Sequence, residues 1–204
     1  MGIDRAAVDR LLDRARREVD EGLLPSVQVA LGYQGELVAF ESYGDATNDT
    51  RYVIFSATKP FVASVMWQLI AEGTVDVSKP VIEYFPEFGA NGKDGITVEQ
   101  VMLHTSGFPH APMGPKVWAE RSTRREIMAG WRLNWEPGTR YEYHPTSAHW
   151  VLAEIIDTVT GNDYRDEVEA RVTGPLGLGR ILGIAKDRRE GIAQLEPVGE
   201  LATP

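Results

Sequence analysis

The chain has 204 residues, of which 43% are hydrophobic and 25% charged, with a net charge of -9 and no cysteine. This is an ordinary globular composition, long enough for one core or for a core with a small subdomain. It excludes disulfides and thiolate metal sites, and the acidic balance argues against a nucleic-acid partner. We expect the protein to work without a metal or another cofactor.

The N-terminus gives no sign of a targeting segment. Residues 1–5 lack a basic start followed by an apolar core, and no apolar run approaches membrane-spanning length. We therefore expect a cytoplasmic protein without a membrane partner, the alternative being export of a precursor that is then processed.

Residues 4–21 predict an amphipathic surface helix. Apolar residues recur along it at helical spacing: Val8, Leu11, Leu12, Ala15 and Val19. Residues 27–31 and 37–40 predict two strands, with a tight turn at residues 33–36 between them. The chain is therefore expected to form a β-hairpin after its first helix.

A hydroxyl and an amine lie three residues apart where the next helix is expected. Apolar positions recur from residue 57 to 71, which predicts a helix with a wide buried stripe and Ser56 as its N-cap. Side chains three apart share a helix face, so Lys59 can reach the Ser56 hydroxyl. A serine becomes a nucleophile when a neighbour takes its proton, and the helix N-terminus would favour an oxyanion. The alternative is a capped core helix with a solvated lysine.

Helices and loops are expected further along the chain. Thr97 can cap a short helix that has Glu99 in its first turn. Residues 108–115 hold three prolines and a glycine, which predicts a loop that could form a wall of the substrate site. Trp118 and Trp135 follow and could line that site, although tryptophans at such spacing are more often in the core.

Two more helices are expected after a turn at residues 136–140. Thr146 or Ser147 can cap the first of them, which is expected to stop at Gly161. A further helix is expected over residues 164–172.

Three motifs occur in a fixed order along the chain. They are Ser-Ala-Thr-Lys at 56–59, Val-Met-Leu-His-Thr-Ser-Gly-Phe at 101–108 and Glu-Pro-Gly-Thr-Arg-Tyr-Glu-Tyr at 136–143. Together they resemble the serine β-lactamase-related family, in the branch of class C β-lactamases, family VIII esterases and D-aminopeptidases. Residues 174–178 resemble the segment that closes the helical part of that family. The resemblance spans residues 5–185 and implies an α+β, β-lactamase/transpeptidase-like fold, with an antiparallel sheet and a helical subdomain.

The resemblance also implies roles for particular residues. Ser56 would attack a substrate carbonyl, its N–H would help to hold the oxyanion, and Lys59 and Tyr143 would share the transfer of its proton. The resemblance implies that His104 packs beneath the site and holds loop backbone, rather than acting as a base. Gly107 would supply a backbone conformation that other residues resist.

The chain departs from the family pattern after the tyrosine. Family members often carry an asparagine that holds a substrate amide, where this chain has Pro145. Ser147 or His149 could replace it. The side chains that we expect to bind substrate are His144, Ser147, Trp118 and Trp135. An ester has no amide N–H to be recognised, so the departure favours esters over β-lactams.

We expect a single domain over residues 1–204. Residues 1–73 would hold the hairpin and the nucleophile helix, residues 74–178 the helical part and residues 179–204 a tail. Relatives continue into further strands, one carrying a Lys-Thr-Gly or His-x-Gly element and the second oxyanion donor, and no such element follows residue 180. We therefore expect the C-terminal strands to come from a companion chain or from a homo-oligomer.

These patterns predict a serine hydrolase that acts through an acyl-enzyme on a small-molecule ester. One alternative is a hydrolase of β-lactams or D-amino-acid peptides, whose substrate is an amide. Another is a non-catalytic β-lactamase-like subunit for binding or assembly, completed by another chain. Labelling of Ser56 by a fluorophosphonate separates the catalytic hypotheses from the non-catalytic one.

Overall fold

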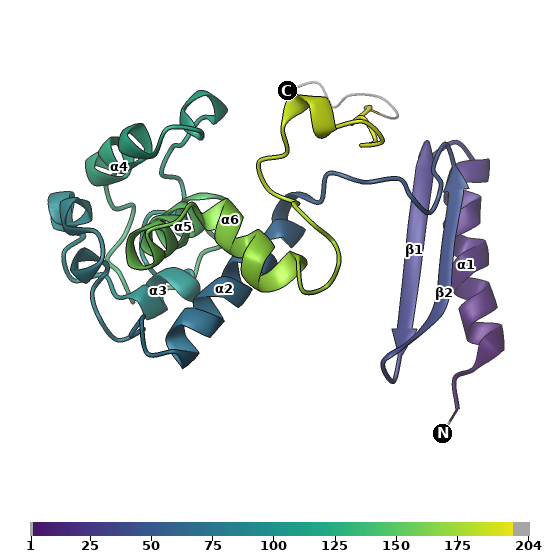
Figure 1. The fold of residues 1–204 in the computed structure, drawn as a ribbon, viewed down its shortest axis with the longest axis horizontal. Coiled ribbons are helices and arrows are strands. Elements are labelled where there is room, and N and C mark those ends of the chain that lie inside the picture. Colours follow the sequence, from purple (N-terminus) through teal and green to yellow (C-terminus); the bar gives the residue numbers. More distant parts are fainter. Residues whose placement is uncertain (1, 198–204) are drawn as a thin grey trace. The chain divides into compact units, whose positions relative to one another are not determined.

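The computed structural model describes residues 2–197, which form two compact units (Figure 1). The hairpin unit runs from the start of the chain to Ile54 and includes the segment that begins at Ala185. The helical unit runs from Phe55 to Ile184. Within the described part of the chain, no helix is long and apolar enough to cross a membrane.

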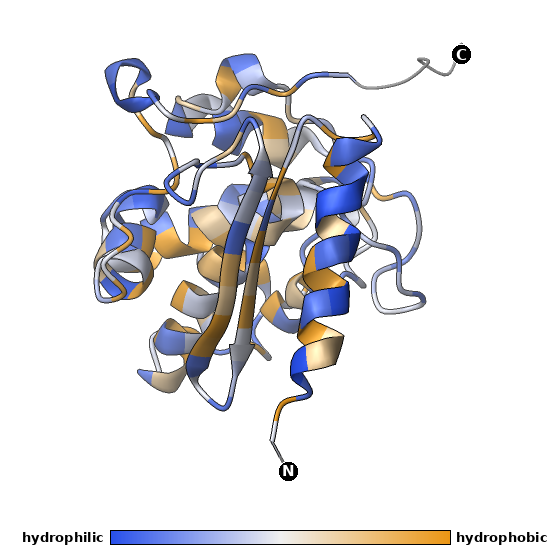
Figure 2. Cartoon of the chain, turned by 90° about the vertical axis from the view of Figure 1, so that its right-hand side faces the viewer, coloured by the Kyte–Doolittle hydropathy of each residue, from blue (hydrophilic) through white to orange (hydrophobic). Residues whose placement is uncertain are grey.

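A helix and a two-stranded hairpin make up most of the hairpin unit. The helix α1 covers Arg5–Asp20, and the antiparallel strands β1 and β2 cover Ser26–Tyr33 and Glu36–Gly44. The strands pair along their length with one irregularity after Leu31, and α1 packs against both. Figure 2 shows hydrophobic residues interspersed with hydrophilic ones along α1. The predicted helix and hairpin are confirmed, and the strands are longer than expected.

The segment after Ala185 joins the hairpin unit through Arg51. The Arg51 N–H donates to the Gly191 carbonyl at 3.1 Å, and the Ala193 N–H donates to the Arg51 carbonyl at 2.8 Å. A 3-10 turn, Lys186–Arg188, precedes this contact. Of the expected tail, residues 198–204 lie outside the described residues.

Helices joined by loops and short turns make up the helical unit. Its α-helices are α2 (Lys59–Ala71), α3 (Val98–Met102), α4 (Arg121–Gly130), α5 (Ser147–Thr160) and α6 (Tyr164–Val168). Turns of 3-10 helix cover Phe55–Thr58, Val81–Glu83, Pro86–Gly92 and Pro115–Val117, and a π-helical turn, Glu169–Thr173, continues α6. This arrangement agrees with the predicted helical subdomain.

The helix that follows the candidate nucleophile starts later than predicted. Ser56 lies within the 3-10 turn, α2 begins at Lys59, and Thr58 occupies the N-cap position without a side-chain cap bond. Pro60 accounts for this start, because its fixed φ and missing N–H suit the first turn of a helix. The prediction that Ser56 is the N-cap is therefore wrong, while the helix itself is confirmed.

The helix α5 lies at the centre of the helical unit, where α2, α3 and α6 pack against it (Figure 1). Its large, fully buried apolar residues are Val151, Leu152, Ile155 and Ile156. Burial of each such side chain stabilises the fold by roughly 1.5–3 kcal/mol. Gly161 ends α5 with φ 74°, as predicted. At its start, Thr146 makes no cap bond, and the Ser147 hydroxyl donates instead to the Phe108 carbonyl at 2.9 Å.

A buried ion pair joins α4 to α5. Arg124 and Asp157 are each 2% exposed, and Arg124 Nη2 lies 3.0 Å from Asp157 Oδ2. Burial raises the pKa of Asp157 to about 6, against the opposing effects of the Tyr164 N–H and the Arg124 charge. A second cluster nearby joins Arg121 and Arg125 to Glu154. The contact between these helices therefore depends on paired charges as well as on apolar packing.

We predict that Arg124→Met strongly destabilises the protein, because it removes the closest counter-charge of a buried carboxylate and leaves Asp157 only the more distant Arg121, whose Nε lies 3.6 Å away. Removing one partner of a buried pair typically costs about 3–5 kcal/mol. Urea unfolding followed by far-UV circular dichroism measures the change in the free energy of unfolding.

Two further variants serve as controls for this prediction. The double variant Arg124→Met/Asp157→Asn should recover much of the loss, because the amide oxygen can still accept from the Tyr164 N–H. Arg180→Met, which breaks the more exposed pairs with Asp166 and Glu169, should cost about 1 kcal/mol or less. Equal losses for the Arg124 and Arg180 single variants would contradict the prediction.

Candidate active site

Two hydrogen-bond donors meet on the hydroxyl of Ser56. Lys59 Nζ donates to Ser56 Oγ at 3.0 Å, and Tyr143 Oη donates to the same oxygen at 2.9 Å. The Lys59 ammonium also lies 4.9 Å from the centre of the Tyr143 ring. The structure thus brings together the three residues that the sequence placed in the chemistry, although Tyr143 is 87 positions from Ser56.

Contacts with Lys59 and Ser56 lower the pKa of Tyr143. The pKa of Tyr143 lies below its ordinary value, first because of its interaction with the Lys59 ammonium and then because of its hydrogen bond with Ser56. A phenol with a lowered pKa gives up its proton more readily, and the phenolate can accept the proton of an attacking serine. The ammonium and the phenol would also stabilise a developing alkoxide at Ser56 Oγ.

The backbone just before Ser56 has an uncommon conformation. Phe55 has φ 43°, in the left-handed region that side chains other than glycine seldom adopt. Its side chain is 67% exposed, so burial of the ring does not explain the conformation. Backbone strain of this kind is concentrated at functional sites, where the surrounding structure holds it in place.

Backbone hydrogen bonds position Tyr143 by tying its segment to the loop after α3. The Glu142 N–H donates to the His104 carbonyl at 3.2 Å, and the Gly138 N–H donates to the Thr105 carbonyl at 2.7 Å. A third bond, from Asn134 N–H to the Gly107 carbonyl, is 2.7 Å long. The loop and the tyrosine segment therefore form one hydrogen-bonded layer.

His104 lies beneath Tyr143 within this layer. Its ring centre is 5.0 Å from that of Tyr143, and its Nδ1 accepts from the His144 N–H at 3.1 Å. Burial, followed by the nearby His144 and Lys59 charges, lowers the pKa of His104. A neutral ring that accepts a backbone N–H holds the loop and adds no charge to the site.

Gly107 lies where another backbone segment passes very close. Its φ is 87°, and a Cβ added there would lie 2.4 Å from the Trp135 carbonyl oxygen. No ordinary side chain fits at that distance, and the positive φ independently favours glycine. Gly107 therefore allows the loop and the tyrosine segment to approach each other.

The side chains of His144 and Ser147 are bonded to the loop after α3. Both are fully buried. The His144 ring contacts the Ser106 hydroxyl, the Phe108 N–H and the Glu142 carbonyl, while the Ser147 hydroxyl donates to the Phe108 carbonyl. This placement argues against the predicted substrate contact of either residue, because their polar atoms are occupied in holding the loop.

The two candidate tryptophans lie in different surroundings. Trp135 is on the tyrosine segment, and its Nε1 donates to the Glu142 carboxylate at 3.3 Å. Trp118 packs against Trp150 with ring centres 5.8 Å apart and donates to the Met113 carbonyl at 3.0 Å. Trp118 is 43% exposed. A substrate contact for either tryptophan stays a prediction.

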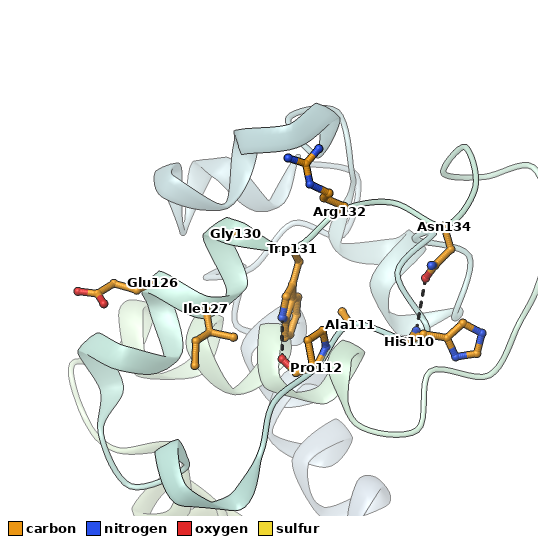
Figure 3. Close-up of a pocket in the computed structure, with 9 residues that line it drawn as sticks. All are labelled: His110, Ala111, Pro112, Glu126, Ile127, Gly130, Trp131, Arg132 and Asn134. Carbon is orange, nitrogen blue, oxygen red and sulfur yellow. Dashed lines mark hydrogen bonds between the residues drawn. The ribbon is translucent and has the colours of Figure 1, made fainter.

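A hollow on the described surface is not lined by Ser56, Lys59 or Tyr143. It has a volume of about 440 Å³, and Figure 3 shows Trp131, Ile127 and His110 among the residues around it. The Trp131 indole donates to the Pro112 carbonyl at 2.9 Å, which closes one wall. We place the chemistry at Ser56, Lys59 and Tyr143 because these reactive side chains are hydrogen-bonded to one another, whereas none of them lines the hollow. Within residues 2–197, no cluster of three or more suitable side chains could hold a metal ion.

The family model and the similar proteins all point to one family. The family model described as Beta-lactamase matches residues 8–182. "Esterase/beta-lactamase LipL" of Mycobacterium tuberculosis is 34% identical over 141 residues, which are 65% of this chain and 32% of that protein. A "Putative D-alanyl-D-alanine carboxypeptidase" of Salmonella agona is 26% identical over 207 residues, covering 87% of this chain and 48% of that protein. The chain thus spans half or less of the length of these relatives.

Solved structures confirm the expected fold class. A penicillin-binding protein homolog from Caulobacter crescentus matches 97% of this chain and 56% of its own, with a TM-score of 0.82 and 26% identity. A family VIII carboxylesterase matches 97% of this chain and 57% of its own, with a TM-score of 0.84 and 25% identity. The described residues therefore have the β-lactamase/transpeptidase-like α+β fold, over about half of each related structure.

We predict that Gly107→Ala slows acylation and destabilises the protein, because its Cβ would push the loop away from the Trp135 carbonyl. The expected loss of stability is about 1–3 kcal/mol, typical of a non-glycine residue forced into such a conformation. Thermal unfolding and the rate of Ser56 labelling measure the two effects. Gly95→Ala is the matched control, since a Cβ there meets nothing within 4 Å. Wild-type behaviour of Gly107→Ala would contradict the account of this contact.

Proposed function

The chain belongs to the β-lactamase family of serine hydrolases, which includes esterases, carboxypeptidases and β-lactamases, and we propose that it hydrolyses small esters. The observation that carries the proposal is the double hydrogen bond to Ser56 Oγ from Lys59 and Tyr143. A serine that only caps a helix, or that is simply exposed to solvent, is not expected to accept hydrogen bonds from both a lysine and a tyrosine distant in the sequence. Two donors on one oxygen suit a serine alkoxide, and once Tyr143 has lost its proton the phenolate would be the adjacent base that a serine nucleophile requires.

The proposed reaction has two stages. Ser56 Oγ attacks the ester carbonyl carbon while its proton passes to the Tyr143 and Lys59 pair, and the Ser56 N–H helps to hold the oxyanion. Collapse of the tetrahedral intermediate breaks the bond to the alcohol, which leaves with that proton. Water then attacks the acyl-enzyme, giving up a proton to the same pair, and the carboxylic acid leaves as Ser56 regains its hydrogen.

The preference for esters rests on the segment that follows Tyr143. Pro145 is exposed there and carries no side-chain donor or acceptor for a substrate amide. Of the two possible replacements for the asparagine, Ser147 is buried and already bonded, and the ring nitrogens of His149 are shielded from solvent. An ester has no N–H, so it requires no hydrogen-bond acceptor from the segment that follows Tyr143.

A second candidate function is hydrolysis of D-amino-acid peptides. It is favoured by the similarity over 87% of this chain to the Salmonella agona protein named as a carboxypeptidase. A β-lactam substrate is a third candidate, since the Mycobacterium tuberculosis relative is named both esterase and β-lactamase. The bonded trio argues against a purely non-catalytic subunit. Cytoplasmic location and completion by a companion chain or homo-oligomer stay predictions.

We predict that Ser56→Ala abolishes ester hydrolysis and fluorophosphonate labelling without unfolding the protein. Ser56 is exposed, so loss of its hydroxyl should change the free energy of unfolding by about 1 kcal/mol or less. Release of p-nitrophenol, intact mass after labelling and circular dichroism measure the three properties. Thr47→Ala, an exposed hydroxyl of the hairpin unit, is the control. Turnover retained in Ser56→Ala would remove Ser56 from the mechanism.

We also predict that short-chain p-nitrophenyl esters are hydrolysed faster than the cephalosporin nitrocefin. The physical reason is that Pro145 offers no hydrogen bond to the amide of the cephalosporin side chain. Comparison of kcat/KM for the two substrates on one preparation tests it. Nitrocefin turnover as efficient as that of a short-chain ester would favour the β-lactam hypothesis instead.

A further inference from the structure

Glu142 directly precedes Tyr143, and its backbone is held at both of its polar groups. Its N–H donates to the His104 carbonyl at 3.2 Å. Its carbonyl accepts from His144 Nδ1 at 2.6 Å, since Nε2 of that ring accepts from the Phe108 N–H and the ring proton is therefore on Nδ1. The chain on the N-terminal side of the tyrosine is thus fixed from two directions.

The carboxylate of Glu142 joins the loop after α3 to the tyrosine segment. Its Oε1 lies 3.0 Å from Nε2 of His110, which belongs to the loop. Its Oε2 accepts from Trp135 Nε1 at 3.3 Å and from the Arg140 guanidinium, both on the tyrosine segment. The pKa of Glu142 is lowered, chiefly by the Arg140 hydrogen bond, so the group is ionised at neutral pH. One side chain therefore bridges the two segments.

These contacts distinguish Glu142 from an ordinary exposed ion pair. Its side chain is 26% exposed and is held by three groups. A single exposed pair restrains two flexible side chains and contributes little to stability. A carboxylate held at both oxygens also restrains the backbone that carries it, because few rotamers satisfy all of its partners. The contacts of Glu142 therefore bear on the position of the chain more than on its stability.

Tyr143 is the neighbour whose position matters most. It is 42% exposed, so burial does not fix its ring. Its phenol nevertheless lies 2.9 Å from Ser56 Oγ. A reactive side chain must be held to within about 0.5 Å by the residues that support it. For an exposed ring, that support comes largely from the backbone, which Glu142 restrains.

We propose that Glu142 is a positioning residue that acts through Tyr143. Its carboxylate bridges the loop after α3 to the tyrosine segment, and so holds the backbone of Tyr143 where the phenol reaches Ser56 Oγ. The proposal rests on the proposed function of Ser56. In this role Glu142 touches neither the substrate nor the reacting atoms.

Three variants separate the bridge from the charge of Glu142. Glu142→Ala removes both. Glu142→Gln removes the charge, but its amide oxygen can accept from Arg140 and Trp135 while its NH2 group donates to a neutral His110. Glu126→Ala, at an exposed acid of α4, is the matched control. For each variant, kcat and KM with a short-chain p-nitrophenyl ester, the rate of fluorophosphonate labelling and the melting temperature are measured.

The proposal predicts a specific pattern among these variants. Glu142→Ala should lower kcat and the labelling rate by about ten-fold or more, with little change in KM, because the phenol is displaced from Ser56 Oγ. Glu142→Gln should stay within about three-fold of wild type, and Glu126→Ala should match wild type. Wild-type rates in Glu142→Ala, or equal losses in the Ala and Gln variants, would overturn the proposal.

His110→Ala tests the bridge from its other end. The His110 side chain is 69% exposed, so its loss should leave the protein folded. If His110 acts through Glu142, the double variant His110→Ala/Glu142→Ala should be no slower than Glu142→Ala alone. Losses that multiply would show that His110 acts independently, and would overturn the bridge.

The titration of Tyr143 tests the inference without turnover. Carbon NMR of protein labelled at tyrosine, assigned with Tyr143→Phe, follows the phenol. Loss of a negative charge alone favours the phenolate and lowers the pKa of a tyrosine, whereas displacement from Lys59 and Ser56 raises it. The proposal therefore predicts a higher pKa of Tyr143 in Glu142→Ala than in wild type, and no such rise in Glu142→Gln.

This titration also separates the inference from the proposed function. If wild-type protein neither labels nor hydrolyses esters, the proposed function fails, and the pKa of Tyr143 still decides the positioning role. An unchanged or lower pKa of Tyr143 in Glu142→Ala would overturn that role.

Discussion

The site depends on a convergence of two donors, from Lys59 and Tyr143, on the oxygen of Ser56. The first distance is local, because Ser56 and Lys59 are separated by one turn of the chain. The second joins residues 87 positions apart and requires the whole helical unit to be correctly packed. Many of the contacts around the site hold Tyr143 in the place where its hydroxyl reaches Ser56 Oγ.

The layer beneath Tyr143 provides that constraint. Gly107 allows the loop after α3 to approach the tyrosine segment, and His104 holds the backbone at His144. The side chains of His144 and Ser147 then bind the same loop from α5 and its approach. The sequence suggests that these polar side chains could bind a substrate, but in the structure they hold one backbone segment against another. A shift of about 1 Å at this position would separate the base from its nucleophile.

The sequence predicts the local features well, and the long-range ones only through resemblance. The spacing of Ser56 and Lys59, the hairpin and the end of α5 at Gly161 follow from periodicity and turn chemistry. Tyr143 could be assigned only from the family pattern, because nothing local indicates which tyrosine reaches Ser56. The burial of His144 and the bridge made by the Glu142 carboxylate depend on contacts between distant segments. Nothing in the local sequence predicts the left-handed conformation of Phe55 either, because residues other than glycine seldom adopt a positive φ.

In the proposed reaction, Lys59 and Tyr143 act on Ser56 as one proton-handling unit. The most direct test is a double-mutant cycle of Lys59→Met and Tyr143→Phe, with the acylation rate of Ser56 measured by a fluorophosphonate in each of the four proteins. Groups that act as a unit lose activity non-additively, so the double variant should be little slower than the slower single variant. If instead the two losses multiply, the residues act independently, and the shared role proposed for them is contradicted.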